Sequence, residues 1–146
     1  MRPIYQILLA ALFAACTTTT ASPTPTPAAS LVEATPVAVT GGTFWRLSPE
    51  ALHAKLTDKN FFLVNTHIPY EGELEQTDAF IPFDTITQHL DQLPADKNAP
   101  IVLYCRSGRM STMAAEALVK AGYTNIWELA GGMLAWEKAG LTVVHK

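Results

Sequence analysis

The chain has 146 residues, of which 49% are hydrophobic and 16% are charged, and its formal net charge is −3. This length suits one domain, and the slightly acidic balance excludes a nucleic-acid surface, which needs clustered cations. Seven acidic residues, but no Lys or Arg, lie between Lys59 and Lys97. We interpret this stretch as a solvated face. The alternative is that its loop from Glu71 to Asp78 docks a basic partner protein.

The first 40 residues lack the composition of a folded domain. A positive start precedes a mostly apolar run, which predicts a signal peptide over residues 1–15. Small residues directly before Cys16 resemble a bacterial lipobox, which implies cleavage there and lipidation of the Cys16 sulfur. Residues 16–40 are rich in Thr, Pro, Ala and Ser, which predicts a disordered tether. We therefore expect an extracytoplasmic protein held by lipid on a bacterial membrane, with ordinary secretion as the alternative.

Residues 41–146 form the predicted domain, in which short apolar strands alternate with helices. The predicted elements, in chain order, are a helix after Ser48, a strand over 61–65, a loop over 66–78, a helix over 84–93, a strand over 100–105, a helix from 109 or 110 that stops at Gly122, a strand over 125–129, a last helix after Gly131–Gly132, and a strand or extended tail over 141–144. This alternation predicts an α/β fold with a small parallel sheet and helices on both faces.

The segment Cys-Arg-Ser-Gly-Arg-Met-Ser, residues 105–111, joins a predicted strand to a predicted helix. Its thiol therefore lies at the edge of an open α/β sheet where ligands bind. Backbone N–H groups and the positive end of the helix stabilise an anion there, and Arg106 and Arg109 add full charges. Gly108 allows close approach of the backbone. We predict that Cys105 forms a reactive thiolate that meets an anionic substrate. The alternative is an inert core cysteine.

Metal and nucleotide sites are not predicted. The histidines are scattered without the spacing of metal ligands; they are His53, His67, His89 and His145. The pair Gly131–Gly132 is too short a signal for a nucleotide-binding loop and is better interpreted as a turn. We therefore expect no cofactor.

From Leu103 to Leu141 the chain is similar to the catalytic half of the rhodanese (thiosulfate sulfurtransferase) family. The resemblance covers about residues 44–145 and rests on the cysteine loop, the helix after it, the segment Ala-Gly-Tyr-Thr-Asn-Ile-Trp-Glu-Leu and the turn Gly-Gly-x-x-Ala-Trp. It implies that the Cys105 thiolate takes the outer sulfur of a donor such as thiosulfate. The resulting persulfide then passes that sulfur to a thiol or cyanide. The implied anion cradle consists of Arg106, Ser107, Gly108, Arg109, Met110 and Ser111.

Three departures from the family pattern remove charge from the site. Family members carry an arginine five residues after the cysteine, where this chain has Met110. Arg109, one position earlier, is turned by about 100° if the helix has begun. The family's Asp-x-Arg is Asn65-Thr66-His67 here, so we expect Asn65 and His67 at the wall of the site. The usual Gly-His-Ile-Pro-Gly is reduced to Phe80-Ile81-Pro82. These changes leave the fold intact and put thiosulfate in doubt as the natural donor.

Two other functions stay open. Phosphatases and arsenate reductases related to this fold need an arginine six residues after the cysteine, where this chain has Ser111. A membrane-tethered binding module without turnover is favoured by Met110 and by the acidic loop. The reactivity of Cys105 distinguishes such a module from an enzyme.

Overall fold

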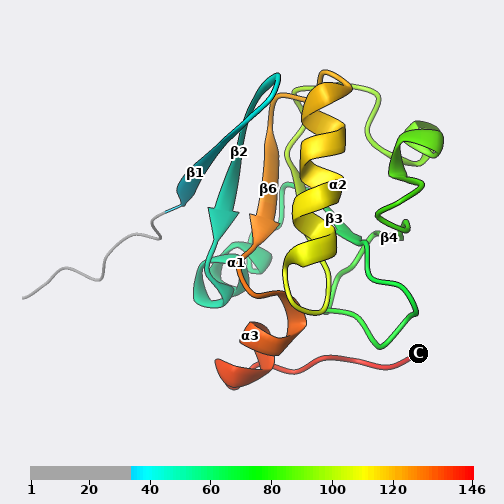
Figure 1. Ribbon diagram of the computed structural model, residues 1–146. Coiled ribbons are helices and arrows are strands. Elements are labelled where there is room, and N and C mark those ends of the chain that lie inside the picture. Colours follow the sequence, from blue (N-terminus) through cyan, green and yellow to red (C-terminus); the bar gives the residue numbers. More distant parts are fainter. Residues whose placement is uncertain (1–33) are drawn as a thin grey trace, which may run out of the picture.

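A six-stranded sheet with helices on both faces forms the domain in the computed structural model, which describes residues 34–146 (Figure 1). The strand order is β1-β2-β6-β5-β3-β4, and every neighbouring pair is parallel except β1 with β2. The strands are β1 (Thr35–Val39), β2 (Gly42–Leu47), β3 (Phe62–Asn65), β4 (Ala79–Phe80), β5 (Ile101–Tyr104) and β6 (Ile126–Leu129). The helices are α1 (Pro49–Leu56), α2 (Arg109–Lys120) and α3 (Gly132–Lys138). The predicted α/β class is confirmed.

The predicted signal peptide, the lipidation of Cys16 and most of the predicted tether lie outside the described residues. Within residues 34–146, no helix has the length and apolar character needed to cross a membrane.

A hairpin extends the domain beyond its predicted start at residue 41. β1, which the composition of residues 16–40 predicts as part of the tether, pairs antiparallel with β2, and Val39 lies opposite Gly42. The tether prediction is therefore wrong for residues 35–39. Pro36 is tolerated there because an edge strand leaves an N–H position without a partner. Val37 and Val39 also pack against the core on the α2 side of the sheet.

The helix predicted over 84–93 is also wrong. Two short 3₁₀ helices, η1 (Ile86–Gln88) and η2 (Leu90–Gln92), take its place. The β-branched run from Thr85 to Thr87 weakens α-helix formation. The segment still reaches the core through buried Ile86 and Leu93.

The sheet separates two apolar cores, because side chains alternate between its two faces. On β5, Ile101 and Leu103 belong to the core beneath α2, whereas Val102 and Tyr104 belong to the core beneath α1 and α3. Figure 1 shows α2 in front of the sheet and α1 behind it. Burial on both faces explains the near-continuous apolar strand sequences.

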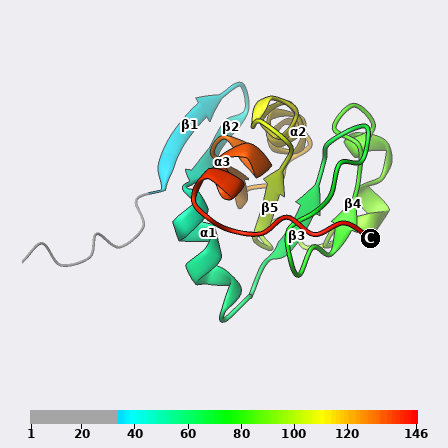
Figure 2. The same ribbon diagram turned by 90° about the horizontal axis from the view of Figure 1, so that it is seen from below.

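The C-terminal segment is an extended tail rather than a strand of the sheet. The backbone of Val144 exchanges two hydrogen bonds of 2.8 Å with that of Glu73. The indole of Trp136 also donates to the carbonyl of Thr142 at 3.0 Å. Figure 2, in which the molecule is seen from below, shows this tail crossing in front of β5 and β3. It ties the long loop over residues 66–78 to α3.

Tyr104 is the polar residue of β5, and its buried hydroxyl forms hydrogen bonds with two residues of the 66–78 loop. The hydroxyl accepts from the N–H of Leu74 at 3.0 Å and lies 2.8 Å from the Thr77 hydroxyl. Burial raises the pKa of Tyr104, so it stays a neutral donor and acceptor. Tyr104→Phe is expected to lower the free energy of unfolding by about 1–3 kcal/mol, because the buried Leu74 N–H loses its partner.

Urea denaturation measures this change. Tyr123→Phe is the matched control, because the Tyr123 hydroxyl has no hydrogen bond to any residue from 34 to 146. An equal loss in the two variants would contradict the assigned role of the Tyr104 hydroxyl.

Candidate active site

Cys105 follows β5 directly, and the loop after it ends where α2 begins at Arg109. Gly108 closes the loop with a left-handed conformation at φ 93°, which explains the glycine. The predicted strand–loop–helix arrangement is therefore present at the carboxyl edge of the sheet. The positive end of the twelve-residue α2 begins at this loop.

Cys105 is only 1% exposed, and its sulfur faces the loop that follows it. The N–H of Gly108 donates to Sγ at 3.1 Å, and the hydroxyl of Ser111 lies 3.4 Å from Sγ. An inert core cysteine is surrounded by apolar groups. This sulfur has two hydrogen-bond donors directed at it, which is the environment of an anion.

The start of α3 supports the loop from its other side. The N–H groups of Met133 and Leu134 donate, each at 2.9 Å, to the carbonyl oxygens of Cys105 and Arg106. Gly132 makes this approach possible, because a Cβ there would lie 2.2 Å from the Cys105 oxygen. The Gly-Gly turn is thus a buttress for the cysteine loop.

The opening of the site carries less positive charge than its sequence suggests. Arg106 is half-exposed, and its guanidinium forms an ion pair of 2.8 Å with Glu71. Met110 extends from α2 to His67, where its sulfur lies 3.3 Å from Nδ1. Nε2 of His67 is 3.4 Å from Glu71 but has no hydrogen-bond partner within the described chain. Two of the cradle residues therefore contact the 66–78 loop.

The remaining predicted site residues divide into two kinds. Ser107 and Arg109 are exposed, and their side chains make no hydrogen bond or ion pair within residues 34–146. Asn65 is fully buried, donates to the Gly72 carbonyl at 2.9 Å and accepts from the His67 N–H at 3.0 Å. Its amide holds the 66–72 loop in place, so it shapes the site wall from behind.

Most acids of the Glu71 to Asp78 loop are neutralised within the domain. Besides the pair of Glu71 with Arg106, Glu73 pairs with Lys146 and Asp78 pairs with Lys59. This loop therefore presents little unpaired negative charge to a basic partner.

Sequence reasoning missed a buried network beside the cysteine. Glu128 of β6 is 1% exposed and receives hydrogen bonds from Arg46 at 2.7 Å and from Ser111 at 2.9 Å. Arg46 also donates to the Thr112 hydroxyl at 3.2 Å. Burial raises the pKa of Glu128, and the hydrogen bonds from Arg46 and Ser111 oppose this rise. The sequence signal that could have revealed this network is Glu128 itself, an acidic residue in a strand that was expected to be buried on both faces.

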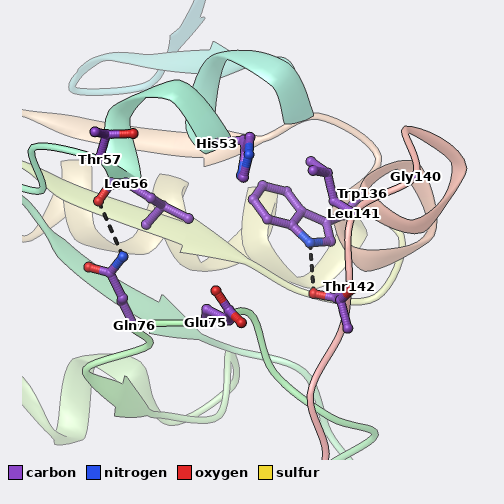
Figure 3. A pocket seen from close by; sticks show the side chains of 9 residues that line it. All are labelled: His53, Leu56, Thr57, Glu75, Gln76, Trp136, Gly140, Leu141 and Thr142. Carbon is purple, nitrogen blue, oxygen red and sulfur yellow. Dashed lines mark hydrogen bonds between the residues drawn. The ribbon is translucent and has the colours of Figure 1, made fainter.

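A hollow of about 190 Å³ borders the cysteine loop at Arg106, across from Glu71, and is lined further by Met133 and Leu134. Another hollow, of about 290 Å³, lies away from the loop around His53 and Trp136 (Figure 3). Its lining has no nucleophilic thiol, and the Trp136 indole is already bonded to Thr142. The chemistry is therefore concentrated at Cys105.

The fold and the site define an α/β domain that presents a cysteine in an anion-stabilising loop. The model of the rhodanese-like domain family matches residues 49–139, more than half of the chain. This chain belongs to the rhodanese-like family.

Individual relatives agree with this assignment. A sulfurtransferase of Allochromatium vinosum is 33% identical over 103 residues, which cover 67% of this chain and 92% of that protein. An uncharacterized protein of Synechocystis is 35% identical over 100 residues, 67% of this chain and 55% of that protein. The crystal structure of a rhodanese-like domain protein from Staphylococcus aureus aligns with a TM-score of 0.57 and 27% identity, over 68% of this chain and 98% of that one.

Proposed function

We propose that this rhodanese-like sulfurtransferase domain carries sulfane sulfur as a persulfide on Cys105. The observation that supports the proposal best is the sulfur's environment: a backbone N–H and a hydroxyl directed at Sγ, at the start of α2. Such groups stabilise a thiolate and then the terminal sulfur of a persulfide.

Two displacements make up the proposed reaction. In the first, the Cys105 thiolate forms a bond to the outer sulfur of the donor, and the donor's S–S bond breaks with its electron pair on the leaving fragment. In the second, an acceptor thiolate or cyanide bonds to that sulfur, and the electron pair returns to Cys105. No external oxidant or reductant is needed, because the sulfane sulfur is only passed on.

The proposed donor is a small sulfane-sulfur compound, a class that includes thiosulfate and organic persulfides, and the charges at the site distinguish between these two. Glu71 engages Arg106, and Met110 with His67 occupies the opening where a further cation would bind a dianion. An organic persulfide carries less negative charge than thiosulfate and needs fewer cations. The arrangement therefore favours an organic persulfide over thiosulfate.

We also propose that the domain works outside the cytoplasm, with lipid on Cys16 holding it at a bacterial membrane. Support comes from the N-terminal sequence pattern alone. Labelling with a fatty-acid probe in a bacterial host is expected to modify the full-length chain and to leave Cys16→Ser unmodified.

The test of the proposed function uses the full-length chain with Cys16→Ser, which makes Cys105 the only thiol. The reduced protein is incubated with thiosulfate or with cysteine persulfide, and its intact mass is recorded. We expect a gain of one sulfur atom that cyanide removes and that the additional change Cys105→Ser prevents. No gain from either donor, together with slow alkylation of Cys105, would favour the binding module.

A phosphatase or arsenate reductase activity has no support in this site. The position six residues after the cysteine is Ser111, whose hydroxyl bonds to Glu128 at 2.9 Å. A buried carboxylate next to that position disfavours the transfer of an oxyanion with several charges.

A further inference from the structure

Glu128 occupies a costly position, directly beneath the cysteine loop. A Cβ placed on Gly108 would lie 3.2 Å from its Oε1, and its side chain is almost completely buried. A buried ion pair gives little net stability, because desolvation offsets much of the attraction. The pair with Arg46 therefore does not by itself explain why β6 carries an acid here.

Ser111 connects this carboxylate to the catalytic sulfur. Its one hydroxyl proton has three acceptors within reach: Cys105 Sγ at 3.4 Å, the Gly108 carbonyl at 3.0 Å and Glu128 Oε1 at 2.9 Å. A serine hydroxyl can donate one hydrogen bond and accept others at the same time. Its oxygen can therefore take a proton from one neighbour while it gives its own to the other.

The site stabilises one negative charge in either of two places. When Glu128 is the anion, Arg46 and Ser111 donate to it at 2.7 and 2.9 Å. When Cys105 is the anion, the Gly108 N–H, the Ser111 hydroxyl and the start of α2 stabilise it. Two charges at once would leave a single Ser111 proton between two anions, which repel each other.

We propose that Cys105, Ser111 and Glu128 share one proton, and that Glu128 holds it, through Ser111, while Cys105 is the thiolate. The inference rests on the proposed function, in which Cys105 is the nucleophile. The proton leaves Sγ for the Ser111 oxygen as the Ser111 proton passes to Glu128 Oε1. Glu128 becomes neutral, Cys105 becomes the anion, and the net charge is unchanged. Glu128 is thus a positioning residue for the proton.

This proton follows the catalytic cycle. It stays on Glu128 while Cys105 carries the persulfide, whose terminal sulfur is then the anion. When the acceptor removes that sulfur, the electron pair returns to Cys105, and the proton can pass back through Ser111. The thiol is restored without proton exchange with solvent inside a buried loop.

Glu128 is the ionisable group that the Ser111 hydroxyl links to Cys105. Arg46 of β2 bonds to Glu128, while Arg106 is engaged by Glu71. Other ionisable groups around the loop are Arg109 on α2 and His67 on the 66–78 loop. Burial raises the pKa of Glu128 above its ordinary value, which brings its affinity for the proton closer to that of a thiol.

The test is the pH profile of Cys105 alkylation by iodoacetamide, measured on the full-length chain with Cys16→Ser. Iodoacetamide reacts with the thiolate, so the rate follows the thiolate fraction. Two groups that share a proton lose their protons in two macroscopic steps. We expect the rate to rise to a plateau, and then to rise again about one pH unit or more higher.

Glu128→Gln removes the second site and is expected to give a single step. Glu116→Gln, an acid-to-amide change at a half-buried position of α2, is the control and is expected to keep both steps. A single step in the parent protein, or two steps retained in Glu128→Gln, would overturn the proposal. A purely structural role of Glu128 would change the rate but not the number of steps.

Arg46→Gln provides a second route if Glu128→Gln does not fold. Loss of the cation is expected to move the first step up by about one pH unit, whereas Lys120→Gln is expected to leave it in place. An unmoved first step in Arg46→Gln would overturn the proposal.

Alkylation needs no sulfur donor, so failure of the shared proton can be distinguished from failure of the proposed sulfurtransferase function. Two steps in the pH profile without sulfur loading would support the shared proton and contradict the sulfurtransferase function. One step together with sulfur loading would contradict the shared proton and support the sulfurtransferase function.

Discussion

Met110→Arg is expected to raise kcat/KM for thiosulfate about 10- to 100-fold. Met110 extends from the first turn of α2 to His67 at the opening of the site. An arginine there would add a charged donor next to a loop in which Arg106 is already engaged by Glu71. A hydrogen bond to a charged group contributes about 1.5–3 kcal/mol, and every 1.4 kcal/mol corresponds to about a tenfold change in affinity.

The measurement is cyanide-dependent thiocyanate formation at several thiosulfate concentrations. Met113→Arg is the matched control, because Met113 is 48% exposed on the same helix, and it adds an identical charge away from the cysteine. Cysteine persulfide should gain much less than thiosulfate from Met110→Arg. Equal gains in the two arginine variants would mean that overall charge, and not the opening of the site, limits the use of thiosulfate.

Gly132→Ala is expected to lower the free energy of unfolding by about 3 kcal/mol or more and to abolish sulfur loading. The new Cβ would lie 2.2 Å from the Cys105 carbonyl oxygen and 2.8 Å from that of Arg106. Both are backbone atoms of the catalytic loop, so the clash is relieved only if the loop or α3 moves. Overpacking costs about 1–3 kcal/mol, and strain at a positive φ of 58° adds to it.

Gly140→Ala separates the two contributions. Gly140 has a φ of +80°, but a Cβ there would meet nothing within 4 Å. It is therefore expected to lose only about 1 kcal/mol, from backbone strain, and to keep full sulfur loading. Urea denaturation and intact mass provide the two measurements. Similar losses in the two variants would show that conformational strain, and not the clash with the cysteine loop, sets the requirement for Gly132.

Local patterns predicted most of the fold. The apolar runs of β3, β5 and β6 and the amphipathic α2 were found because burial imposes a period on the sequence within each element. The same patterns gave wrong predictions where contacts with other segments determine the local structure. Residues 35–39 have the composition of a tether, but they form a strand because they pair with β2 at the edge of the sheet. Residues 84–93 have helical spacing, but their β-branched start and their reach to the core favour two 3₁₀ turns.

At the site, too, local features were predicted from the sequence and long-range contacts were not. The position of Cys105 between a strand and a helix, and the glycine that closes its loop, are local features that the sequence displays directly. The contacts of Arg106 and Met110 depend on a loop some 35 to 43 residues earlier in the chain. Neither partner is visible from the loop sequence.

The sequence by itself determined the α/β class, the catalytic loop and its cysteine, because a strand, a turn and a helix start are each specified by neighbouring residues. Tertiary structure alone decided what surrounds the thiol. Arg46 and Glu128 are 82 residues apart and meet because β2 lies beside β6 in the sheet. Strand order brings them to Ser111, and strand order follows from how the whole sheet is buried, not from any one segment.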